Sequence, residues 1–142
     1  MIDVDDVLRR LLSAPKVTRD ALAAVPTEQG VYVLWLAAEP PACLKVGIAG
    51  PRKGEGLRAR LRNHFGSSPS NSVLARHLAA DRTAHWCNGH DFTNRAERRA
   101  FIADGCYFQA VAVPTETRRE LEQVEAAIIG RLQPAYVGRV GG

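Results

Sequence analysis

The first 25 residues alternate between apolar and polar positions with a helical period. Apolar side chains recur every three or four residues after Asp3, and a second short helical segment runs from Thr18 to Ala24, before Pro26. The pattern predicts two short helices without recognisable chemistry. We therefore interpret residues 1–25 as an N-terminal helical extension.

Three short runs rich in β-branched and aromatic residues predict strands. They are Gly30–Leu36, Cys43–Ile48 and Cys106–Val113. A six-residue loop (37–42) between the first two predicts an antiparallel hairpin, and Pro114 ends the third run.

The remaining periodic segments predict helices. They cover about 57–65, 72–81, 94–104 and 117–132. The last one opens with the capping-box spacing of Thr117 and Glu120 and ends before Pro134. Few strands among several helices predict a small α+β or mixed α/β sandwich.

Glu125 falls on the apolar face of the helix predicted over 117–132. In projection it lies among Leu121, Ile128 and Leu132 rather than on the polar side. An unpaired buried carboxylate is costly, so Glu125 should be paired, protonated or bound to a metal. A structural pair with an arginine is the alternative explanation.

Two polar residues also lie beside the apolar face of the helix predicted over 57–65. Arg60 and His64 are one turn apart, whereas Arg58 and Arg62 point to the opposite, solvent side. Together with Glu125, this pair predicts a polar site near the edge of the sheet.

The hairpin adds a tyrosine and a lysine. Alternation places Tyr32 with Leu34 on one face of the first strand, and Lys45 with Cys43 and Gly47 on one face of the second. Because a nearby cation lowers the pKa of a phenol, Tyr32 beside Lys45 is a candidate general base. An ordinary strand tyrosine and edge lysine are the alternative.

Length and composition indicate a single domain with a basic net charge. The chain has 142 residues and a net charge of +4, and 16 of its 19 cationic residues are arginines. Arginine binds phosphate oxygens in pairs, although a GC-rich genome would also encode many arginines. Three cysteines and the absence of a long apolar run predict a cytoplasmic protein without disulfides or membrane spans.

Four pieces of the sequence together resemble one nuclease superfamily. They are Gly30-Val31-Tyr32, Lys45-Val46-Gly47, the pair Arg60 and His64, and Glu125 nine residues before Pro134. Over about 27–138 the chain resembles the GIY-YIG nucleases. The resemblance implies a compact α/β/α sandwich around a three-stranded antiparallel sheet, formed by residues 26–142 with an insertion at about 66–105.

The resemblance also implies a divalent-metal-dependent DNA endonuclease. Tyr32 would activate water, Arg60 would hold the scissile phosphate, and His64 would assist proton transfer or phosphate binding. Glu125 would be the single protein ligand of Mg²⁺ or Mn²⁺. A homodimer would be needed to cut both strands, because one chain carries one such site.

Further residues take supporting roles in this interpretation. Phosphate contacts dominate the affinity of proteins for DNA, so we expect auxiliary backbone contacts from the basic residues around the site. These are Arg52, Lys53, Arg58 and Arg62, while Gly30 and Gly47 would permit close packing. The arginines of 66–105 would recognise the target, or this segment is a solvated helical insertion.

Two positions depart from the family pattern. Lys45 replaces the usual tyrosine, and some restriction-type members of the family also carry lysine there. In this chain Lys45 would help to lower the pKa of Tyr32. Val137 replaces the asparagine that often follows the Pro-x-Tyr ending. The alternative functions are therefore a nucleic-acid-binding module that kept the fold but lost turnover and a protein-interaction domain.

Overall fold

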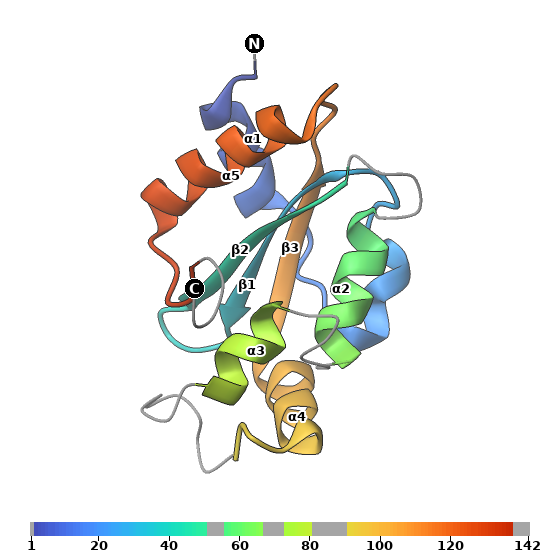
Figure 1. Ribbon diagram of the computed structural model, residues 1–142, viewed down its shortest axis with the longest axis vertical. Coiled ribbons are helices and arrows are strands. Elements are labelled where there is room, and N and C mark those ends of the chain that lie inside the picture. Colours follow the sequence, from blue (N-terminus) through green and yellow to red (C-terminus); the bar gives the residue numbers. More distant parts are fainter. Residues whose placement is uncertain (1, 51–55, 67–72, 81–90, 138–142) are drawn as a thin grey trace.

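A three-stranded antiparallel sheet lies at the centre of the structure (Figure 1). Its strands are β1 (Gly30–Leu36), β2 (Ala42–Ala49) and β3 (Cys106–Ala112), in the order β2-β1-β3. The computed structural model describes residues 2–50, 56–66, 73–80 and 91–137. The predicted hairpin is confirmed, with a loop of 37–41 that is one residue shorter than expected.

The register of the hairpin places the chemistry-bearing residues on one face. Tyr32 pairs with Gly47, and Leu34 pairs with Lys45. The register then shifts, so that the next pair is Trp35 with Cys43. The shift corrects the prediction that Cys43 shares a face with Lys45, because an extra residue in one strand reverses the alternation.

One face of the sheet is covered by α1 (Val4–Ser13) and α5 (Arg118–Leu132), which lie together in Figure 1. Val7 and Leu11 of α1 and Leu121, Val124 and Ile128 of α5 are buried against valines of the strands. The predicted capping box at the start of α5 is present. The last helix therefore begins and ends where the sequence predicted.

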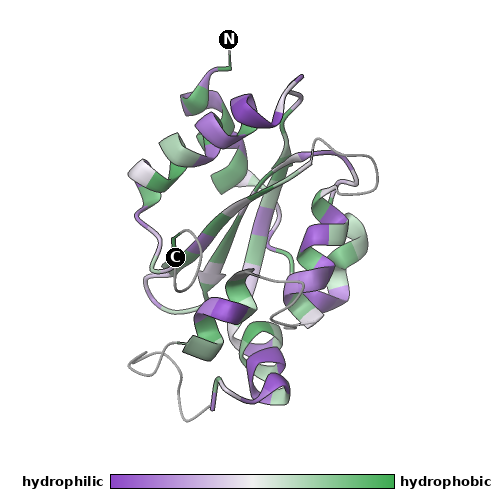
Figure 2. Cartoon of the chain, viewed as in Figure 1, coloured by the Kyte–Doolittle hydropathy of each residue, from purple (hydrophilic) through white to green (hydrophobic). Residues whose placement is uncertain are grey.

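The other face carries α2 (Leu57–Gly66), α3 (Val73–Ala80) and α4 (Arg95–Gly105). Their apolar side chains pack with those of β1 and β3, above all around the fully buried Phe108. In Figure 2 purple and green alternate along these helices, as expected for helices with one buried side. The α3 and α4 part of 66–105 thus belongs to the core and is not merely a solvated insertion.

Residues 2–25 are integral to the domain. They form α1 and a 3₁₀ helix, η1 (Arg19–Ala24), so their helical character is confirmed. However, Val17 forms a β-bridge with Phe108, and its side chain is buried in the core. The N-terminal helical segment therefore packs on both faces of the sheet, because both core clusters include its apolar side chains.

Strand β3 holds α1 in place through a buried amide. Gln109 is 5% exposed, and its Nε2 donates to the carbonyls of Leu12 and Ala14 at 3.0 and 2.9 Å. Its Oε1 accepts from the indole of Trp35 at 2.9 Å. One side chain thus satisfies the C-terminal end of α1 and a tryptophan at once.

Within the part of the chain that the structure describes, no helix has both the length and the apolar character needed to cross a membrane.

Candidate functional site

A tyrosine and a histidine form the centre of the candidate site. The Oη of Tyr32 lies 2.5 Å from Nε2 of His64, which connects β1 to α2. Tyr32 is 3% exposed and His64 is 1% exposed, and both rings pack against Phe108. The prediction that His64 faces inward from its helix is confirmed.

Glycine at position 47 gives the Tyr32 ring its place. A Cβ at Gly47 would lie 2.2 Å from the Oη of Tyr32 and 2.3 Å from its Cζ. No side chain fits there without displacement of the phenol. Gly30 is equally confined, because a Cβ there would lie 2.0 Å from the carbonyl oxygen of Val111. Both glycines therefore permit close packing, as predicted.

Lys45 and Glu125 lie within electrostatic reach of each other near the edge of the sheet. Lys45 is 8% exposed on β2, the edge strand, against which α5 packs. Glu125 is half-buried on α5, and the charges of the two groups act on each other. Burial lowers the pKa of Lys45 and raises the pKa of Glu125, and their mutual attraction partly opposes both shifts. Glu125 is thus half-buried rather than on the solvent side of α5, and its charge also acts on Tyr32.

Arg60 completes the group. Its side chain is half-buried on α2, and its positive charge acts to lower the pKa of both Tyr32 and His64. We call the five residues the Tyr32 cluster: Tyr32, Lys45, Arg60, His64 and Glu125. The structure brings them within electrostatic reach of one another, although they come from both helical layers and the sheet.

The protonation states of the central pair follow from burial. Burial raises the pKa of Tyr32, and the nearby charge of Arg60 opposes this shift without overcoming it. The expectation that a cation lowers this pKa below its ordinary value is therefore wrong. Burial is the main cause that lowers the pKa of His64 to about 3, and the charges of Arg60 and Lys45 add to it. The imidazole is therefore neutral near pH 7.

The predicted DNA-contacting residues have mixed outcomes. Arg58 donates to the carbonyls of Val25 and Ala23 at 3.0 and 2.9 Å, which corrects the expectation that it points to solvent. Arg62 is exposed, as predicted. Arg52 and Lys53 lie outside the described residues.

The arginines of α4 also have structural partners. Arg98 is buried and donates to the carbonyl of Phe92 at 2.8 Å, while Arg95 donates to the carbonyl of Gly66 at the same distance. Arg99 is exposed. Target recognition by this segment stays a prediction, with Arg98 removed from the surface that would carry it.

The candidate site offers one carboxylate, that of Glu125, as a ligand for Mg²⁺. Among the described residues, no group of three or more His, Cys, Asp or Glu side chains is arranged to hold a metal ion. A hard cation that keeps most of its waters requires only one or two carboxylates. The half-buried carboxylate of Glu125 has the donor chemistry that such a site needs.

Arg118, in the first turn of α5, is a further residue near the site that was not among the predicted ones. Its charge acts on both Tyr32 and Glu125, and its Nη1 donates to the carbonyl of Gly50 at 2.5 Å. Arg118 precedes Glu125 by seven residues, which is two helical turns and therefore the same face. That spacing was the available signal.

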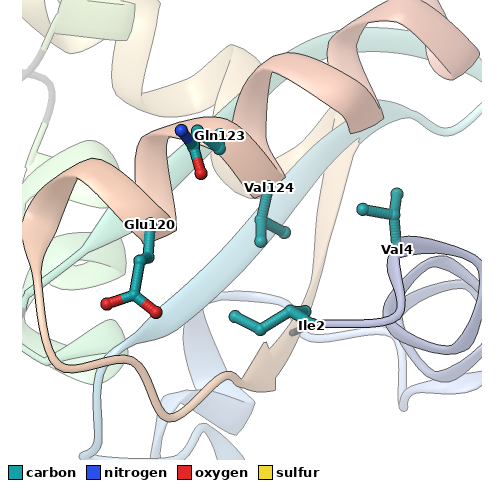
Figure 3. Close-up of a pocket in the computed structure, with 5 residues that line it drawn as sticks. All are labelled: Ile2, Val4, Glu120, Gln123 and Val124. Carbon is teal, nitrogen blue, oxygen red and sulfur yellow. The ribbon is translucent and has the colours of Figure 1, made fainter.

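A surface pocket of about 200 Å³ lies between α5 and the residues around the start of α1 (Figure 3). It is lined by Ile2, Val4, Glu120, Gln123 and Val124. No member of the Tyr32 cluster lines this pocket, so it does not contribute to the site.

Comparison with known proteins gives no family assignment. No model of a protein family matches the chain, and no curated protein matches its sequence. The resemblance to the GIY-YIG nucleases thus depends on the motif residues and on the arrangement described above.

Proposed function

We propose that the protein is a divalent-metal-dependent DNA endonuclease of the GIY-YIG type. The observation that carries the proposal is the 2.5 Å contact between Tyr32 and His64, set among the charges of Lys45, Arg60 and Glu125. Hydrolysis of a phosphodiester needs an acceptor for the proton of water and positive charge at the phosphate. The Tyr32 cluster offers both.

The proton path follows from the two shifted pKa values. Because Tyr32 is protonated near pH 7, its oxygen accepts a proton from water only as it gives up its own. In the tautomer with an unprotonated Nε2, His64 accepts a hydrogen bond from the Tyr32 hydroxyl. The proton of the attacking water then moves to Tyr32 while the hydroxyl proton moves to His64.

Arg60 and Lys45 supply the positive charge. Arg60 is half-buried beside both members of the pair, so its guanidinium suits a phosphate held next to the Tyr32 oxygen. Lys45 adds a second cationic group on the same face of the hairpin. Both charges also oppose formation of an imidazolium until the negatively charged phosphate is bound.

Glu125 is the residue that would hold Mg²⁺ or Mn²⁺. Its carboxylate is half-buried and near Lys45, at the border between the sheet and α5. When bound, such a cation supplies electrostatic stabilisation of the charge that develops on the phosphate and the leaving oxygen. The role of Glu125 is to fix the position of that cation.

The burial of the central pair favours one alternative function. With exposures of 3% and 1%, Tyr32 and His64 are closed to solvent in the free protein. Val137, in place of the family asparagine, is 53% exposed. A DNA-binding module without turnover would have these properties, and it would bind DNA in a salt-sensitive manner without metal-dependent cleavage.

The test is nicking of supercoiled plasmid DNA with Mg²⁺ or Mn²⁺. Wild type is expected to yield open-circular DNA first, and Glu125→Gln or Arg60→Ala should reduce the rate by about a hundredfold or more. Glu116→Gln is the matched control, because Glu116 is exposed and lies before α5. If wild type and both site variants nick at the same rate, the proposal is wrong.

A further inference from the structure

The first turn of α5 is tied to the end of β2 by Arg118. Its Nη1 donates to the carbonyl of Gly50, which directly follows β2. Gly50 has a φ of 89°, a backbone conformation that other residues rarely adopt. The local backbone thus presents this carbonyl to α5, and the bond holds the guanidinium in place.

The same guanidinium lies next to the candidate site. Gly50 is three residues beyond Gly47, the glycine that the Tyr32 ring touches. Glu125 lies two turns further along the same face of α5. The charge of Arg118 acts to lower the pKa of both Tyr32 and Glu125, so it is within electrostatic reach of both.

With the residues that the structure describes, Arg118 uses only part of its hydrogen-bonding capacity, and the rest can bind a ligand. Its Nε lies 3.5 Å from Oε1 of Glu122, and the two side chains are 48% and 58% exposed. An exposed pair of this kind contributes little stability, so a phosphate oxygen can replace the carboxylate. Because Gly50 already orders the side chain, phosphate binding costs less conformational entropy than at a free surface arginine.

We propose that Arg118 is a second phosphate-binding arginine of the site, which holds the DNA backbone from the α5 side while Arg60 holds it from the α2 side. The inference rests on the proposed DNA-binding function. The two arginines come from helices on opposite faces of the sheet, and the charges of both act on Tyr32, so a strand bound at Tyr32 would lie between them. Arginine suits this position because its planar fork can bind a carbonyl and a phosphate together.

The salt dependence of DNA binding tests the inference without cleavage. Binding of a short duplex DNA is measured in EDTA over a range of salt concentrations. The slope of log K against log salt is negative, and each lost phosphate contact reduces its magnitude by about 0.9. Arg118→Gln should lower it by this amount and weaken binding about tenfold at low salt. Arg118→Lys, which keeps the charge, should retain the slope.

Arg119→Gln is the matched control. Arg119 is the next residue of α5, is exposed, and points about 100° away around the helix. Its slope should equal that of wild type, and thermal unfolding of all variants confirms that they fold. The inference is wrong if Arg118→Gln keeps the wild-type slope, if it matches Arg119→Gln, or if Arg118→Lys loses as much as Arg118→Gln.

The plasmid assay separates the two proposals. If wild type nicks DNA but Arg118→Gln keeps the wild-type slope, only this inference fails. If wild type binds DNA without nicking it and Arg118→Gln lowers the slope, the endonuclease proposal fails and the phosphate contact stands. If wild type binds no DNA, both proposals are overturned.

Discussion

Gly47 and Tyr32 face each other across the hairpin, and the tyrosine occupies the space that a side chain at position 47 would fill. The inward orientations of Tyr32 and His64 could be predicted from strand and helix periodicity. The protonation of Tyr32 could not, because its burial depends on Phe108 of β3, which the hairpin sequence does not contain. Local patterns predict direction, whereas pKa depends on the assembled environment.

Gly47→Ala should destabilise the protein. The added Cβ would lie 2.2 Å from the Tyr32 oxygen, and we expect a loss of about 1–3 kcal/mol in the free energy of unfolding. Urea denaturation measures the change. Gly130→Ala is the control, because a Cβ there meets nothing within 4 Å and alanine favours the helix by up to about 1 kcal/mol. Equal effects of the two substitutions would contradict the close contact of Gly47 with Tyr32.

His64 should make stability depend on pH. Its pKa is about 3 in the folded protein, against about 6.5 when unfolded. Below pH 6.5 the unfolded chain therefore binds a proton that the folded protein does not. The free energy of unfolding should fall as the pH falls from about 6.5 toward 3.

His64→Gln is the matched variant for this measurement, since it keeps an acceptor for the Tyr32 hydroxyl and removes the titration. Urea denaturation at several pH values should show a shallower pH dependence for the variant than for wild type. Identical pH profiles would mean that His64 is not held neutral by its environment.

At the scale of elements, most helix and strand positions could be predicted because their ends carry strong local signals. The capping box at Thr117 starts α5, and Gly105 and Pro114 flank β3. The register shift within β2 and the packing of residues 2–25 could not be predicted in this way. Both depend on contacts between elements far apart in the chain.

The attachment of α1 gives a prediction at this scale. Gln109→Ala would leave the Trp35 indole and the carbonyls of Leu12 and Ala14 without the partner they now share. We expect a loss of about 2 kcal/mol or more in the free energy of unfolding. Amide hydrogen exchange should accelerate more in α1 than in α5.

Gln123→Ala on α5 is the control for this change, because Gln123 is exposed. Its effect should stay within about 0.5 kcal/mol. Uniform acceleration of exchange in both helices after Gln109→Ala would contradict a specific role of Gln109 at α1.

At the scale of the whole molecule, the candidate site combines residues of the sheet with residues of the helices on its two faces. Arg60 and His64 come from α2, Lys45 from β2 and Glu125 from α5. The family resemblance predicted that these groups converge, and the structure brings them within electrostatic reach. The use of Arg58 to bind carbonyls near η1 depends on long-range packing, so the sequence pattern did not reveal it. Arg118, by contrast, could have been found from its helical spacing to Glu125.

The central claim is that the Tyr32 oxygen takes the proton from the water that attacks the phosphodiester. The most direct test is the nicking rate of Tyr32→Phe at saturating protein with Mg²⁺ or Mn²⁺, with DNA binding measured in parallel. The substitution removes one oxygen, so binding should be unchanged while the rate falls about 10²–10⁴-fold. Wild-type nicking by Tyr32→Phe, or no metal-dependent nicking by wild type, would contradict the account.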